Sequence, residues 1–216
     1  MRPLLLPILA LIVIAGANCK SKSAEAPKLI CDTTCLKDTI KFSLEDHKLK
    51  PYVYISANNC KADSIIWSYK GMGSNRKTKF DYPDVFLNKD FVRCIFKDTA
   101  YAYLLFNDCA TSRGFQIKLP FDKKQSFEMR TSGINNIDPK FSIGDNLLAY
   151  TDRGNIYVQE VATGKKAMMT FGKKLDIDYN ALHEFIDSVN ITNSRIWVKV
   201  KVDEEWKELE KKITLE

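Results

Sequence analysis

The chain has 216 residues, of which 45% are hydrophobic and 28% are charged, and its formal net charge is +6. This composition is typical of one folded domain, or at most two small ones, and it excludes a disordered or collagen-like chain. Basic residues are scattered among acidic ones in runs no longer than a pair, so we expect no nucleic-acid partner.

The N-terminus has the pattern of an export signal. Arg2 is followed by an uncharged run from Leu4 to Ala17. This run is shorter than the roughly 20 apolar residues that a membrane-spanning helix needs. We therefore expect a cleaved leader and not a transmembrane anchor.

Two processing routes fit the end of the leader. Ala15-Gly-Ala17 is a small-x-small site for ordinary signal peptidase, which would release a soluble secreted protein. Gly16-Ala-Asn-Cys19 resembles a bacterial lipobox, which implies acylation of Cys19. We favour the lipoprotein, because the polar residues after Cys19 suit a tether. The predicted organisation is a signal peptide over 1–18, a tether over 19–30 and a single β-rich domain over 31–216.

All six cysteines precede residue 110, and an exported protein is expected to use them in disulfides. If Cys19 is acylated, five remain, so one is free or pairs with another chain. If it is not, three bridges are possible. Only two histidines exist, and Cys31 and Cys35 do not have zinc-ligand spacing, so we assign no metal and no cofactor.

Short runs of aromatic and β-branched residues alternate with turn residues, which predicts a mainly β fold of antiparallel meanders, blade-like or sandwich in type. The predicted strands, in chain order, are 39–43, 52–57, 64–69, 91–96, 100–106, 114–119, 127–130, 146–150, 155–160, 166–171, 188–191, 195–202 and 211–215.

One short helix is expected between 174 and 189. Its apolar positions recur at helical spacing, and Asp176 or Asp178 is placed to cap its start. Acidic residues in the same segment are spaced as in a calcium loop, but Ala181 stands where that loop needs glycine, so the helix is the better interpretation. The segment 203–212 has helical composition, or forms a charged turn with Trp206 packed inwards.

A weak internal repeat suggests two equivalent bridges. Tyr-x-Tyr pairs begin at Tyr52 and Tyr101, and a cysteine follows each first tyrosine by eight residues. Similar segments surround Cys35 and Cys94. If the repeat is real, Cys35 pairs with Cys60 and Cys94 with Cys109, which leaves Cys31 over. The alternative is that tyrosine-rich strands recur by composition alone.

Residues 138–165 contain Asp138-Pro, Phe141-Ser, Ile156-Tyr-Val and Thr163-Gly-Lys in a regular series separated by glycine turns. This series resembles one blade of a TolB-type β-propeller. A blade takes about 40 to 45 residues and rings have 4 to 8 of them, so the resemblance implies blade-like units and not a closed ring.

Five Asp-Ser/Thr tripeptides look like the Bacteroidetes-type O-glycosylation motif of exported proteins. The resemblance implies modification of Thr33, Thr39, Ser64, Thr99 and Ser188. The structural alternative is turn chemistry, because Asp and Thr favour turns and strand entries.

The sequence has no nucleophile elbow and no phosphate loop, and neither His47 nor His183 has a catalytic motif around it, so we assign no catalytic residue. The favoured function is a non-catalytic binding or structural lipoprotein of the cell envelope, outer membrane or periplasm, held to the membrane by its lipid, with a protein or glycan partner. The alternative is a small periplasmic or surface hydrolase acting on envelope or dietary glycans.

Overall fold

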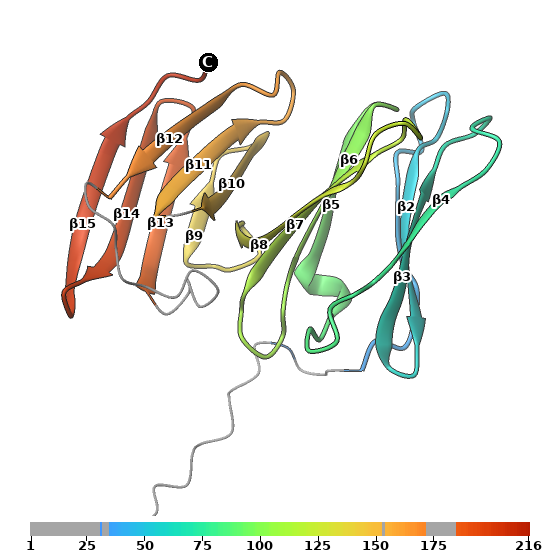
Figure 1. Ribbon diagram of the computed structural model, residues 1–216, viewed down its shortest axis with the longest axis horizontal. Helices are drawn as coiled ribbons and strands as arrows, with labels where there is room; N and C mark the ends of the chain where they lie inside the picture. The colour runs from blue at the N-terminus through green and yellow to red at the C-terminus, as the bar shows by residue number, and fades with distance from the viewer. Residues whose placement is uncertain (1–30, 32–34, 153, 172–184) are drawn as a thin grey trace, which may run out of the picture.

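The computed structural model describes residues 31, 35–152, 154–171 and 185–216. In this part of the chain the protein is mainly β, with antiparallel pairing between nearly all neighbouring strands, as alternation predicted. The strands form an N-terminal and a C-terminal lobe, which lie right and left in Figure 1. No described helix is long and apolar enough to cross a membrane.

The N-terminal lobe is a sandwich of two layers. Its outer layer is a meander of four strands: β1 (Ile40–Ser43), β2 (Tyr52–Asn58), β3 (Lys61–Ser68) and β4 (Arg76–Lys79). Alternation along β2 and β3 buries Val53, Ile55, Ile65 and Trp67 against the second layer. The sequence did not indicate β4, because its four polar residues have no apolar alternation.

The second layer is one half of a seven-stranded sheet that both lobes share. Its order is β12 (Lys166–Thr170), β11 (Asn155–Glu160), β10 (Leu147–Asp152), β8 (Glu128–Ile134), β7 (Gly114–Pro120), β6 (Tyr101–Asn107) and β5 (Val92–Lys97). A short 3-10 helix, Lys89–Phe91, leads into β5. Strands β5 to β7 complete the N-terminal core, whereas β10 to β12 belong to the C-terminal lobe.

A third sheet closes the C-terminal lobe. Its order is β15 (Glu205–Lys212), β14 (Arg195–Val202), β13 (Ile186–Thr192) and β9 (Phe141–Ile143). Alternate residues of β14, from Ile196 to Val202, pack against Ile156 and Val158 of β11. The C-terminal lobe is therefore a second sandwich with its own core (Figure 1).

The blade-like segment only partly forms a blade. Strands β10, β11 and β12 make a consecutive antiparallel meander, and Gly154 and Gly164 have the positive φ that its turns require. Strand β9, however, pairs in parallel with β13 in the other sheet. The described strands form two sandwiches, and no ring closes among them.

Two local expectations change near the C-terminus. Residues 174–184 of the expected helix lie outside the described part, but Ile186 and Val189 belong to strand β13 and not to a helix. Segment 203–212 is neither helix nor simple turn: Asp203 and Glu204 form a hairpin turn with positive φ, and β15 follows. Trp206 lies on the outer face of β15 with 47% of its surface exposed.

One of the two disulfides predicted from the internal repeat is present. Cys35 is joined to Cys60, the expected pair, but Cys109 is joined to Cys31 and leaves Cys94 free. Cys94 lies opposite Leu104 in the middle of the β5–β6 pair, whereas Cys109 follows the end of β6. The backbone from Leu104, opposite Cys94, to the end of β6 is about 10 Å long. Cys94 and Cys109 are therefore further apart than the two Cα atoms that a disulfide can join.

The lobes meet where the shared sheet bends at β8. Only two residues of β8, Gly133 and Ile134, pair with β10. Gly114 of β7 crosses Gly133 so closely that a Cβ on Gly114 would lie 2.2 Å from the Gly133 carbonyl oxygen. Strand β10 is consequently buried on both faces, because Leu148 packs on the outside of β6 while Leu147 faces the C-terminal core.

Candidate functional site

The outward face of the β1–β4 sheet carries two tyrosines at alternate positions of β2. Strand register places the following side chains on this face, which we call the tyrosine face: Lys41, Ser43, Tyr52, Tyr54, Ile66, Lys77 and Lys79. It points away from the rest of the molecule (Figure 1). The rings of Tyr52 and Tyr54 stack with their centroids 4.5 Å apart.

The tyrosine pair borders a hollow of about 410 Å³ between the β1–β2 turn and the β3–β4 loop. The Tyr52 hydroxyl donates a 2.9 Å hydrogen bond to Asn75 in that loop. On the other side, the Lys41 ammonium lies 5.8 Å from the Tyr54 ring centroid. The two rings are thus held at both ends and form a fixed aromatic wall.

The polar side of the hollow is equally ordered. Glu45 accepts hydrogen bonds from Ser43 at 2.6 Å and from Lys50 at 3.2 Å. The Ser43 hydroxyl and then Lys50 lower the pKa of Glu45 below its usual value. A fixed carboxylate, an ammonium group and hydroxyls beside an aromatic wall can bind a ligand that has both apolar faces and hydroxyl groups.

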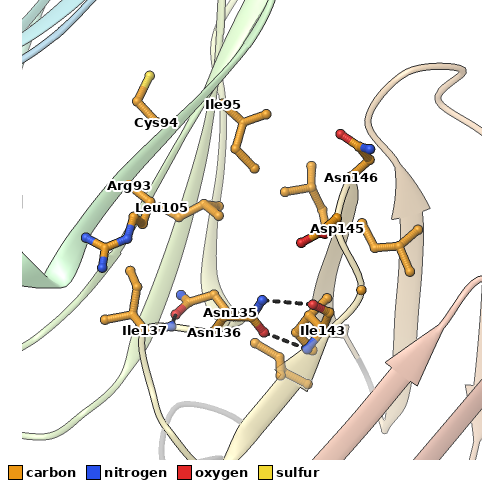
Figure 2. A pocket seen from close by; sticks show the side chains of 14 residues that line it. Arg93, Cys94, Ile95, Leu105, Asn135, Asn136, Ile137, Ile143, Asp145 and Asn146 are labelled. Carbon is orange, nitrogen blue, oxygen red and sulfur yellow. Dashed lines mark hydrogen bonds between the residues drawn. The ribbon is translucent and has the colours of Figure 1, made fainter.

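A second concavity of about 280 Å³ lies between the lobes (Figure 2). Ile95 and Leu105 form its wall on the N-terminal lobe, and Ile137 and Leu148 come from the C-terminal lobe. Asn136 braces its floor by bonding both the amide and the carbonyl of Ile143. These bonds use both ends of the Asn136 amide and fix the segment between β8 and β9, so Asn136 has a structural role at this floor.

Cys94 borders the same cleft, but Figure 2 shows its sulfur directed away from the other labelled side chains. It packs instead against the N-terminal core. Burial raises the pKa of the Cys94 thiol well above its usual value. The thiol is therefore protonated at neutral pH and is not a nucleophile.

One hollow of the described part contains two carboxylates, the minimum for glycoside hydrolysis. Asp38 and Asp90 share this open hollow beside β1, and both residues are exposed. His47 accepts a turn hydrogen bond from the Leu49 amide, and His183 lies outside the described part. No described cluster of histidine, cysteine and carboxylates could hold a metal ion.

The expected glycosylation sites differ in accessibility. Thr39 is exposed, whereas Thr99 and Ser188 are half-buried. Ser64 has only 3% of its surface exposed and its hydroxyl donates to Asp63, so the folded sheet leaves no room for a sugar there. Thr33 and Cys19 lie outside the described residues.

Several other aromatic residues in or beside strands belong to the core and do not line this face. Trp67 and Phe115 are buried in the N-terminal core, and Tyr69 packs on Phe121. Tyr52 and Tyr54 were noticed only as marks of a repeat. The signal that identifies them is alternation: Val53 and Ile55 are the buried partners, which places both tyrosines on the opposite face.

No protein-family model matches the chain, and no curated protein shows detectable similarity to it. The function must therefore be inferred from the chain's own residues.

Proposed function

We propose that the protein is a non-catalytic glycan-binding module of the cell envelope, which recognises sugars with the tyrosine face and its hollow. The observation that carries this proposal is the fixed wall of Tyr52 and Tyr54 beside Glu45, Lys50 and Asn75. Sugars have apolar C–H faces that pack on aromatic rings. Their hydroxyl groups donate to carboxylates and accept from ammonium groups.

Binding fits this surface better than catalysis does. The hollow contains one carboxylate, Glu45, whereas glycoside hydrolysis needs a pair on opposite sides of the scissile bond. Glu45 is also held ionised by its neighbours, so it does not act as a general acid at neutral pH.

The leader and the cysteines support the proposed envelope location. The two disulfides are typical of proteins that fold in an oxidising compartment outside the cytoplasm. Among the described cysteines they leave one free thiol, Cys94, and a lipid at Cys19 would make it the one thiol of the mature chain. A lipid at Cys19 would hold the domain at the membrane by a polar tether, while the tyrosine face stays open to solvent.

The test is a screen of envelope and plant polysaccharides, followed by calorimetry with the best ligand. Replacing Tyr52 and Tyr54 together with threonine keeps β-propensity and removes the wall. We expect affinity to fall about tenfold, since each aromatic contact contributes about 0.5–1.5 kcal/mol. Tyr157→Thr is the control, because Tyr157 is also half-buried and stacked, with Tyr150, but lies in the other lobe.

Two results would contradict the proposal. One is that no polysaccharide binds the folded protein. The other is that the double variant, with an unchanged circular dichroism spectrum, binds as well as the Tyr157 control.

A further inference from the structure

Three lysines frame the tyrosine face from both edges of its sheet. The register runs from Lys41 on β1 through Tyr54 and Ile66 to Lys77 on β4, in one row across four strands. Lys79 lies two residues along β4 on the same side, opposite Ser64. All three lysines are exposed.

These charges are largely uncompensated. None of the three lysines has an ion pair within 4 Å among the described residues. One carboxylate on the same sheet, Asp63, interacts electrostatically with Lys77 and Lys79. Its closest partners are the hydroxyls of Ser64 and Ser56, and the Ser64 hydrogen bond is the main cause of its lowered pKa. The row therefore keeps a positive excess around the aromatic wall.

The lysines are spread out and do not converge. Three strand spacings of about 4.8 Å separate Lys41 from Lys77, which is roughly 14 Å, and Lys79 lies about 7 Å further along its strand. A single small anion would bridge none of these gaps. A chain with repeated negative charges could meet all three lysines while its sugar rings lie against Tyr52 and Tyr54.

We propose that the ligand of the tyrosine face is an acidic polysaccharide, a linear chain with carboxylates on successive sugars. This inference rests on the proposed glycan-binding function and adds the charge of the ligand. The tyrosines supply contact with the sugar rings, and the lysines select a polyanion over a neutral chain through charge complementarity.

The test compares polygalacturonate with its fully methyl-esterified form, which has the same backbone without charge. We expect the wild-type protein to bind the charged polymer more tightly, and added salt to remove the difference. Lys77→Gln/Lys79→Gln should weaken binding of polygalacturonate about tenfold, since each exposed ion pair contributes a few-fold, and should leave the esterified polymer unaffected. The matched control is Lys140→Gln/Lys165→Gln, because both of these lysines are exposed in the other lobe.

A further variant acts in the opposite direction. Asp63→Asn retains an acceptor for the serine hydroxyls and removes a negative charge that interacts with Lys77 and Lys79, so polygalacturonate should bind more tightly. A folding defect would not produce that gain.

Other outcomes separate the two proposals. Equal binding of both polymers, lost in the tyrosine double variant, overturns the charge inference and leaves glycan binding intact. If the protein binds only neutral glycans, and this binding needs the tyrosines, the charge inference is likewise overturned and glycan binding stands. Binding to DNA or anionic vesicles that needs the lysines but not the tyrosines overturns both proposals, as does the absence of binding to any glycan.

Discussion

At the scale of single residues, position along a strand decides what each cysteine does. Cys60 and Cys109 both follow strands, in loops that can approach the N-terminal segment, and both are bridged. Cys94 is in the middle of β5, where its neighbours across the sheet and in the core are apolar. The repeat predicted the same role for Cys35 and Cys94, but only Cys35 lies outside a strand.

The thiol of Cys94 should be slow to react in the folded protein. Its raised pKa keeps it protonated and the residue is half-buried, so a disulfide-exchange reagent should label it much more slowly in the folded protein than after unfolding. Intact mass after alkylation without reduction measures this. In protein made with its own leader, we expect a lipid-modified chain starting at Cys19 and one alkylated thiol in denaturant.

Cys94→Ser serves as the control for this experiment, because it should abolish labelling and keep both disulfides. Three alkylated thiols in denaturant would contradict the disulfide assignment, and fast labelling of the native chain would contradict the protection of Cys94. Two alkylated thiols would mean that Cys19 is present without its lipid. A chain that starts at Asn18 without lipid would contradict the lipoprotein proposal instead.

At the scale of elements, the bend between β7 and β8 depends on two facing glycines. The backbone at Gly114 approaches Gly133 more closely than any side chain allows, and a bulge between Gly114 and Gln116 accompanies the crossing. This bend turns the end of β8 towards β10. The position of the C-terminal lobe, and with it the cleft between the lobes, therefore depends on a contact without side chains.

Gly114→Ala should destabilise the protein by about 3 kcal/mol, because its new Cβ meets backbone that cannot move aside. Urea denaturation measures the change in the free energy of unfolding. The control is Gly73→Ala, where a Cβ meets nothing within 4 Å and only the positive φ costs about 1 kcal/mol. Equal losses in the two variants would show that the crossing tolerates a side chain.

At the scale of the whole molecule, the two lobes are fastened by different means. Both disulfides lie in the N-terminal lobe, where they close separations of 25 and 78 residues, whereas packing holds the described part of the C-terminal lobe. The lobes are joined by two register pairs between β8 and β10, a small cluster around Tyr103 and Leu148, and side-chain hydrogen bonds from Tyr101 to the Val161 carbonyl and from Gln159 to the Tyr103 hydroxyl. We therefore expect the two lobes to differ in their free energy of unfolding and to unfold separately.

Reduction should loosen the N-terminal lobe selectively. Each disulfide contributes up to about 3–5 kcal/mol by restricting the unfolded chain, and none of that restriction acts within the C-terminal core. Hydrogen exchange with and without reductant should show faster exchange in β2, β3 and β6, and little change in β11 and β14. Faster exchange throughout both lobes would mean that they unfold as one unit.

Much of the strand pattern is local and was readable from the chain. In β2, β11 and β14, apolar and polar residues alternate at the period of two that a half-buried strand requires, and these strands formed where expected. Strands β4 and β15 are charged and lack that pattern. They form because each pairs along its whole length with a better-patterned neighbour, β3 or β14.

Only part of the candidate site could be predicted from the sequence. Alternation around Tyr52 and Tyr54 determines that both rings share a face, but nothing local brings Lys77 of β4 into line with Lys41 of β1. Likewise, the sequence predicted a β protein with bridged cysteines. Only the tertiary structure shows that Cys109 pairs with Cys31 and that β9 belongs to the sheet of β13. The physical reason is that the alternation of side chains between two faces is a local property of each strand. Strand order and cysteine pairing depend instead on contacts between segments far apart in the chain.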